Sequence, residues 1–116
     1  MLITFCKAKI AHACVTQAEL YYEGSITIDQ TLVDAVGILP GEKVEIFNVN
    51  NGARLETYVI AGKPGSGQIC LNGPAARLGQ VGDRLIIVSY GLVTPEEAKG
   101  LKTRTIHLDD GNRIKT

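Results

Sequence analysis

The sequence predicts a small, mainly β protein, a compact β-barrel with only short helices. Three observations lead to this fold class. Short runs of alternating or continuous apolar residues recur between turn signals. Thirteen glycines, against four tyrosines and two phenylalanines, indicate a chain that turns often. The stretches with helical patterning are brief, and the 116 residues suffice for one domain with a single core.

The first predicted elements are two strands and a helix. Residues 2–16 alternate between apolar and polar side chains with one slip, and residues 25–28 form a short β-prone run. Asp29 is placed to cap a helical stretch, because its side chain can accept a hydrogen bond from a free backbone N–H of the first turn. Gly37 ends that stretch, since glycine adopts the left-handed conformation of a helix stop.

A hairpin is predicted next. Residues 43–49 and 54–60 are the two strands, and Asn51-Gly52 joins them as a type I′ turn because both residue types tolerate a positive φ. The glycine-rich residues 62–67 lack the glycine and Lys-Ser/Thr spacing of a phosphate-binding loop. They are predicted to form a plain hairpin loop.

The remaining segments complete the β pattern. Residues 68–72 are a strand, and residues 73–76 suit a tight turn or a single helical turn. Residues 85–90 are too apolar for a half-exposed strand and are predicted to be buried on both faces. Residues 94–97 begin a short helix, with threonine as the cap, proline first and glutamate closing a capping box. Residues 105–114 are predicted to form a terminal hairpin.

Composition excludes several classes of function. Twelve basic and twelve acidic residues give no net charge, which argues against a general nucleic-acid binder. No apolar run is long enough for a membrane span, and the first residues lack the pattern of a secretory signal. Cys6, Cys14 and Cys70 are odd in number and without Cys-x-x-Cys spacing, so we expect buried thiols in a cytoplasmic protein. His12 and His107 lack the spacing of metal ligands, and no metal is predicted.

Polar residues in strand contexts are ambiguous from residue type alone. Lys9 lies in an apolar strand, and Arg54, Thr57 and Tyr58 crowd one hairpin arm. These residues are either solvated or packed side chains, or parts of a site. Strand alternation predicts that Arg54 and Tyr58 share one face of the strand and that Thr57 points to the other.

Residues 22–29, Tyr-Glu-Gly-Ser-Ile-Thr-Ile-Asp, resemble the self-cleavage segment of the bacterial aspartate 1-decarboxylase family. These are pyruvoyl enzymes that make β-alanine for pantothenate and coenzyme A. Further blocks of that family occur in order and spacing: Lys9-Ile10, Val15-Thr16, Gly37-Ile38-Leu39, Asn48-Val49, Asn51-Gly52, Arg54, Thr57-Tyr58, Asn72-Gly73, Ala75-Ala76 and Val81-Gly82-Asp83. The resemblance implies a six-stranded double-psi β-barrel, assembled as a homotetramer with active sites between subunits.

The resemblance also implies a reaction. The chain would cleave itself between Gly24 and Ser25 into residues 1–24 and 25–116, and Ser25 would become a covalent pyruvoyl group. That group would form a Schiff base with L-aspartate and accept the electrons released by decarboxylation. Glycine at position 24 would permit strained geometry and an open approach for the hydroxyl.

Roles for the other residues follow from the same resemblance. Thr57 would polarise the Gly24 carbonyl during cleavage. Arg54 would bind a substrate carboxylate through its planar fork, and Lys9 would help to hold the acidic substrate. Tyr58 would donate a proton to the carbanion-like intermediate. The pocket around the pyruvoyl group and the substrate would be shaped by Asn72, Gly73, Pro74 and Ala75.

Two departures from the family pattern are visible. Relatives commonly have Lys-x-His-Arg where this chain has Lys9-Ile10-Ala11-His12, so the usual histidine is Ala11 and His12 stands at the arginine position. Pro74 replaces a common alanine and removes one backbone donor from the pocket. The alternative hypothesis is a catalytically inactive double-psi barrel that acts as a binding or assembly module. The sequence identifies no maturation factor.

Overall fold

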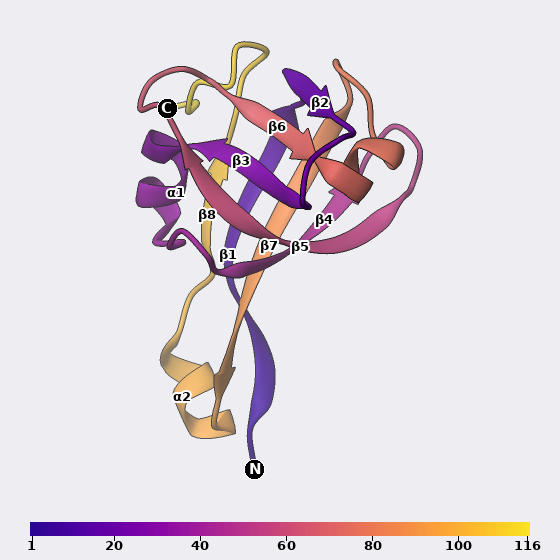
Figure 1. The fold of residues 1–116 in the computed structure, drawn as a ribbon. Coiled ribbons are helices and arrows are strands. Elements are labelled where there is room, and N and C mark those ends of the chain that lie inside the picture. The colour runs from indigo at the N-terminus through magenta and orange to yellow at the C-terminus, as the bar shows by residue number, and fades with distance from the viewer.

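The computed structural model describes all residues 1–116. Its eight strands form one sheet, in the order β2-β6-β3-β5-β4-β7-β1-β8 (Figure 1). The strands are β1 Ile3–Cys14, β2 Gln17–Glu19, β3 Ser25–Asp29, β4 Lys43–Asn48, β5 Arg54–Gly62, β6 Ile69–Asn72, β7 Arg84–Val93 and β8 Arg104–His107. The helices are α1 Gln30–Val36, the 3₁₀ helix η1 Gly73–Arg77, and α2 Pro95–Gly100. The prediction of a mainly β protein with short helices is confirmed.

The strand count differs from the six expected. The two strands at the ends of the strand order, β2 and β8, are additional to the six inner ones. Both are short, with three residues in β2 and four in β8. Both pair in parallel, β2 with β6 and β8 with β1. Sequence patterning missed β2 because its three residues are all exposed and show no alternation.

A single core lies between the curved sheet and α1. Nineteen buried apolar residues form it, including six fully buried isoleucines from five strands: Ile10, Ile26, Ile28, Ile46, Ile69 and Ile87. The buried face of α1 adds Leu32, Val33 and Val36. The predicted ends of α1 are confirmed, because Asp29 accepts a hydrogen bond from Thr31 N and Gly37 adopts a φ of 76°. Burying these side chains supplies the main favourable free energy of the fold.

The slip predicted within residues 2–16 corresponds to real irregularities in β1. Its antiparallel register with β7 shifts between Cys6 and Ala8 and again between Ile10 and Ala13. His12 lies inside the second shift, with a positive φ of 66°. An extra residue in one strand bends that strand and increases its twist, which helps a sheet to curve.

The hairpin between β4 and β5 is confirmed, but the predicted type I′ turn is wrong. Such a turn needs positive φ at both central residues, and of Asn51 and Gly52 only Gly52 has it, at 75°. The loop is longer, because the strands close through the bond from Asn48 N to Ala53 O. Asparagine side chains shape it instead: Asn48 Oδ1 accepts from Asn50 N, and Asn51 Oδ1 accepts from Ala53 N.

Of the two other predicted hairpins, one does not form and one is short. Residues 62–67 do not join paired strands, because β3 lies between β5 and β6 in the sheet. The predicted terminal hairpin is confirmed in a short form: Leu108 bridges Ile114 in antiparallel fashion, Lys115 N donates to His107 O, and Asp109 N donates to Arg113 O. The strand before this turn, β8, also pairs in parallel with β1. In β7 the expected burial holds at the centre of the strand but ends at the exposed Tyr90.

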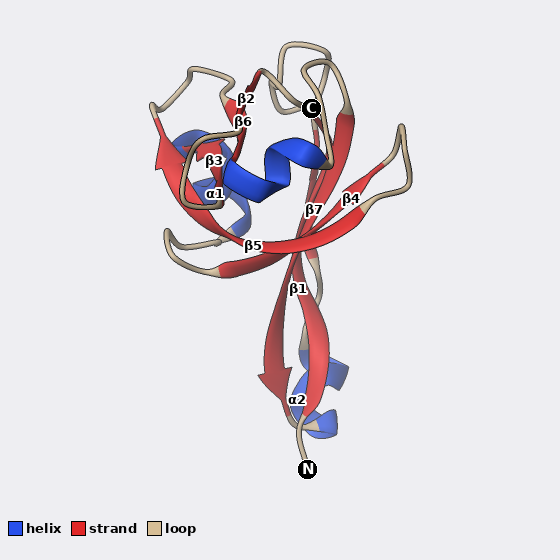
Figure 2. Cartoon of the chain, turned by 45° about the vertical axis from the view of Figure 1, so that its right-hand side comes forward, coloured by secondary structure: helices blue, strands red, loops and turns tan.

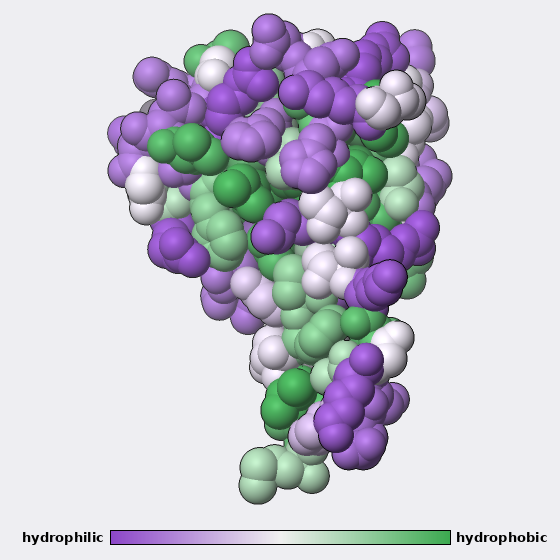
Figure 3. Space-filling view, turned by 180° about the vertical axis from the view of Figure 1, so that it is seen from behind, coloured by the Kyte–Doolittle hydropathy of each residue, from purple (hydrophilic) through white to green (hydrophobic).

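The molecule has a body and a stem (Figures 1 and 2). The stem consists of the first residues of β1, the last residues of β7, and α2, whose predicted capping box between Thr94 and Glu97 is confirmed. Hydrophobic surface gathers on the stem and the adjoining body, beside the hydrophilic α2 (Figure 3). The large apolar side chains exposed there are Leu2, Ile3, Tyr90, Leu92 and Leu101. None of the helices is long and apolar enough to cross a membrane.

Candidate functional site

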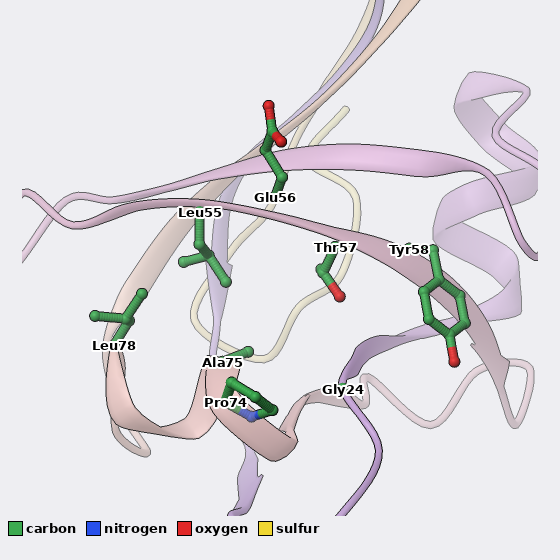
Figure 4. Close-up of a pocket in the computed structure, with 8 residues that line it drawn as sticks. All are labelled: Gly24, Leu55, Glu56, Thr57, Tyr58, Pro74, Ala75 and Leu78. Carbon is green, nitrogen blue, oxygen red and sulfur yellow. The ribbon is translucent and has the colours of Figure 1, made fainter.

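A pocket of about 340 Å³ lies between β5, the start of β3 and η1. Five of the residues singled out from the sequence line it: Gly24, Thr57, Tyr58, Pro74 and Ala75. The remaining lining residues are Leu55, Glu56 and Leu78. Figure 4 shows Thr57 and Tyr58 extending from β5 towards the segment that contains Gly24 and Pro74, whereas Glu56 points away. The structure thus gathers residues from positions 24, 57–58 and 74–75 at one place.

The backbone at the predicted cleavage point is held in an unusual conformation. Gly24 has a φ of 100°, which side chains other than glycine rarely tolerate. Gly73 approaches it closely: a Cβ on Gly73 would lie 2.5 Å from Tyr22 O and 2.6 Å from Gly24 N. Any side chain at position 73 would therefore push the segment before Ser25 out of place. Gly73 shapes this site by having no side chain.

Ser25 is fully buried and has one polar partner from the opposite strand. Asn72 faces it in the antiparallel register of β3 and β6, and Asn72 Nδ2 donates to Ser25 Oγ at 2.9 Å. The same nitrogen donates to Thr27 Oγ1 at 2.9 Å. On the other side of the amide, Cys70 Sγ donates to Asn72 Oδ1 at 3.2 Å. All the hydrogen-bonding atoms of the Asn72 side chain are engaged.

Sequence reasoning missed Thr27 and Cys70 in this network. A signal for both was present, because residues two apart on a strand share a face. Thr27 follows Ser25 by two positions and Cys70 precedes Asn72 by two, and the register pairs Thr27 with Cys70 directly. The cysteine was interpreted only as a small buried hydrophobe. Burial, and to a smaller degree the charge of Glu19, raises the pKa of the Cys70 thiol, which therefore stays protonated at neutral pH.

The alternation predicted for β5 appears in its exposure, since Arg54 and Tyr58 are exposed and Thr57 is half-buried. Thr57 and Tyr58 line the same pocket although they are adjacent in the strand. β5 changes partner at this point: it pairs with β4 over residues 54–58 and with β3 over residues 59–62. The strand curves strongly there (Figure 2). The curvature of β5 therefore allows Thr57 and Tyr58 to border one pocket although they alternate in exposure.

The two candidate cations lie outside this pocket. Arg54 is exposed, and its guanidinium stacks on the Phe47 ring with the carbon 4.0 Å from the ring centroid. It borders an adjoining hollow together with Glu45, and this hollow shares Leu55 and Glu56 with the pocket. Lys9 is half-buried on β1, and β4 and β7 lie between β1 and β5 in the sheet. Within one chain, the structure does not bring Lys9 and Arg54 together with Tyr58 and Gly24.

The residues that depart from the family pattern, Pro74, Ala11 and His12, lie in different parts of the structure. Pro74 lines the pocket at the start of η1, where a proline needs no backbone donor, and its Cδ would contact a Cβ on Gly24 at 3.5 Å. Ala11 is buried. His12 is exposed in the second irregularity of β1 and lines none of the pockets.

The far end of β3 is fixed by a buried carboxylate. Asp29 accepts hydrogen bonds from Thr31 N, Gly65 N and Gly67 N at 2.8 to 2.9 Å. Burial alone would raise the pKa of Asp29, but these backbone hydrogen bonds outweigh it and hold the pKa below its ordinary value. The glycine-rich loop of residues 62–67 thus binds an anion of its own chain, and it holds in place the strand that begins at Ser25.

Comparison with known proteins gives one consistent result. The family model described as "Aspartate decarboxylase" matches residues 1–115. A protein of Clostridium beijerinckii named aspartate 1-decarboxylase is 57% identical over 115 residues, which cover 99% of this chain and 93% of that protein. Proteins of the same name from Leptospira biflexa and Salinibacter ruber are 53% and 52% identical. The matches cover 99% and 98% of this chain, and 98% and 78% of those two proteins.

Proposed function

The chain belongs to the aspartate decarboxylase family, and we propose that it acts through a pyruvoyl group made from its own Ser25. Its activity is that of a carboxy-lyase that converts L-aspartate to β-alanine in pantothenate biosynthesis. The observation that carries the pyruvoyl proposal is the surroundings of the Gly24–Ser25 bond. A buried hydroxyl with a hydrogen-bond donor lies directly after a glycine at a φ of 100°.

The residues present fit the formation of a pyruvoyl group. Ser25 Oγ forms a bond to the Gly24 carbonyl carbon, the bond from that carbon to Ser25 N breaks, and the hydroxyl proton ends on the freed amine. Loss of the Ser25 Cα proton then breaks the Cβ–Oγ bond, which releases the Gly24 carboxylate and leaves dehydroalanine. Water hydrolyses this residue, ammonia leaves, and a ketone remains. Thr57, from the wall opposite Gly24, stabilises the negative charge that develops on the Gly24 oxygen.

When present, the pyruvoyl group accepts the electron pair released as the α-carboxylate leaves. The chain's own residues bind the substrate and move a proton. Tyr58 borders the pocket, and its phenol O–H is a weak acid that can donate a proton to a strongly basic carbon. Arg54 offers two parallel N–H donors to a carboxylate. Pro74 and Ala75, together with Asn72 and Gly73, shape the space around the reacting atoms.

We propose a homotetramer for the assembled enzyme, with active sites between subunits. Three features support it: Lys9 and Arg54 lie outside the pocket of their own chain, that pocket is open, and the stem carries exposed apolar residues. The six inner strands of the sheet, from β6 to β1, would form the double-psi barrel that the family resemblance implies. The pathway would operate in the cytoplasm.

Replacing the nucleophile tests the proposed function. Ser25→Ala removes the only hydroxyl adjacent to Gly24, so we expect an intact chain and no release of carbon dioxide from aspartate. The wild-type chain should give fragments 1–24 and 25–116 and release carbon dioxide. Ser66→Ala is the control, because it removes an exposed serine hydroxyl whose only hydrogen bond is the one it accepts from Gln68 N. An intact wild-type chain that never matures and is inactive towards aspartate would favour the alternative, a binding or assembly module.

A further inference from the structure

The Asn72 side chain can be held in either of two orientations, and only one of them serves Ser25. In the structure its amide nitrogen lies at 2.9 Å from both Ser25 Oγ and Thr27 Oγ1. An amide turned by 180° would place Oδ1 between the two hydroxyls instead. Those hydroxyls could donate to it, so the hydroxyls alone do not select the orientation. The selection must come from the other side of the amide.

Cys70 supplies that selection. Its sulfur lies 3.2 Å from Asn72 Oδ1, and a protonated thiol is a donor to an oxygen but only a weak acceptor for an N–H. Cys70 and Asn72 are each about 4% exposed and Ser25 is fully buried, so no bulk water competes for these bonds. The only other oxygen near the sulfur is Leu71 O, at 4.0 Å. The amide oxygen is therefore its main partner.

The orientation matters for the chemistry at Ser25. An N–H that donates to the hydroxyl oxygen stabilises the negative charge that grows on it as its proton leaves. After the acyl shift, the same oxygen is the leaving atom when the Cβ–Oγ bond breaks, and the N–H again faces developing charge. With the amide reversed, Oδ1 would instead hold the hydroxyl proton.

We infer that Cys70 is a positioning residue for self-cleavage, whose thiol fixes the Asn72 amide so that its nitrogen faces Ser25. The inference rests on the proposed function, because it concerns the rate at which the Gly24–Ser25 bond is rearranged. Cys70 acts through Asn72 and does not contact the scissile bond.

Two substitutions of Cys70 distinguish a role in orienting the Asn72 amide from a role in packing alone. Cys70→Ser keeps a donor next to Asn72 Oδ1 but loses the apolar sulfur, whereas Cys70→Val keeps an apolar side chain and loses the donor. If the thiol positions Asn72, cleavage of Cys70→Ser stays within about threefold of wild type and cleavage of Cys70→Val slows by about tenfold or more. If the thiol only fills space, the order is reversed. Cys14→Ser and Cys14→Val are matched controls, because the only hydrogen bond of Cys14 Sγ is to Val15 O, at 3.9 Å.

The experiment follows freshly synthesised full-length chain over time by denaturing mass spectrometry, with thermal melting of each variant measured in parallel. Should Cys70→Val fail to fold, Cys70→Ala takes its place, since it also lacks a donor. A folded variant without a donor that cleaves at the wild-type rate overturns the inference while leaving the proposed function intact. Failure of the wild-type chain to cleave, as in Ser25→Ala, would instead contradict the proposed function itself.

Discussion

The residues at the candidate site fall into two groups, one suited to making the proposed pyruvoyl group and one suited to using it. Ser25 and Asn72 are buried and hydrogen-bonded to each other, as suits a single slow event in the chain itself. Tyr58 is 42% exposed and faces the pocket, as suits repeated contact with a small substrate. The two groups can therefore be tested separately.

Tyr58→Phe should permit cleavage but slow turnover. The substitution keeps the ring and removes only the hydroxyl, which is the proposed proton donor. We expect kcat to fall by about 10²–10⁴-fold with little change in KM, because proton transfer is lost and substrate binding is kept. Mass spectrometry measures the cleavage and carbon dioxide release measures the turnover. Unchanged kcat in fully cleaved protein would reject the role of Tyr58.

At the scale of elements, β3 is the strand that the site depends on. It begins at Ser25, ends at Asp29, and lies between β5 and β6, so it places the serine opposite Asn72 and directly after the pocket residue Gly24. Asp29 fixes its far end through three backbone hydrogen bonds. The position of Ser25 depends on that anchor.

The Asp29 anchor should make stability depend on pH in the acid range. Its pKa is lowered in the folded state, so its contribution is fully present above the unfolded pKa, near 4, and is lost as pH falls through the folded pKa. Asp29→Asn should lower the free energy of unfolding by about 1–3 kcal/mol at pH 7, and by progressively less below pH 4. Urea unfolding at pH 7 and pH 3.5 measures both values. Asp34→Asn is the control, because Asp34 is exposed on α1 and makes only one side-chain contact, with Gln30. An equal loss at both pH values would show that Asp29 is not held as a carboxylate.

Elements with local signals could be predicted from the sequence, and those that depend on distant partners could not. The caps at Asp29 and Thr94 are interactions within a few residues, so their residue types suffice. The partner of the 62–67 loop is a carboxylate more than thirty residues earlier in the chain. The pairing of β8 with β1 is similarly remote. Neither leaves a periodic pattern in the sequence.

The candidate site shows the same division. Gly24, Thr57, Tyr58, Pro74 and Ala75 were singled out from a family resemblance, and the structure gathers them around one pocket. The hydrogen bonds from Asn72 to Ser25 and Thr27 need the β3–β6 register, which residue types do not reveal. The bond from Cys70 to Asn72 lies within β6, where only the two-residue spacing indicated that the side chains share a face.

At the scale of the whole molecule, the separation of the two cations from the pocket favours a site shared between subunits. Lys9 is on β1, which two strands separate from β5 in the sheet order, while Gly24 and Tyr58 line the pocket of the same chain. A neighbouring copy could bring its own Lys9 to that pocket.

Mixed assemblies test this arrangement. Chains with Ser25→Ala and chains with Lys9→Ala should each be inactive alone. Co-expressed, they should regain activity, because an intact Ser25 from one chain would meet an intact Lys9 from its neighbour. Carbon dioxide release from the purified mixture is the measurement, with the two variants mixed after separate purification as the control. No recovery in a proven mixed assembly would mean that Ser25 and Lys9 must belong to the same chain.

The most direct measurement is the mass of the polypeptide after maturation, taken under denaturing conditions with and without borohydride reduction in the presence of labelled aspartate. The account predicts fragments 1–24 and 25–116, with the larger one lighter by one ammonia than a serine terminus and carrying label only after reduction. A folded chain that gives a cleaved product with a free serine amine, or that never takes up label, would contradict it.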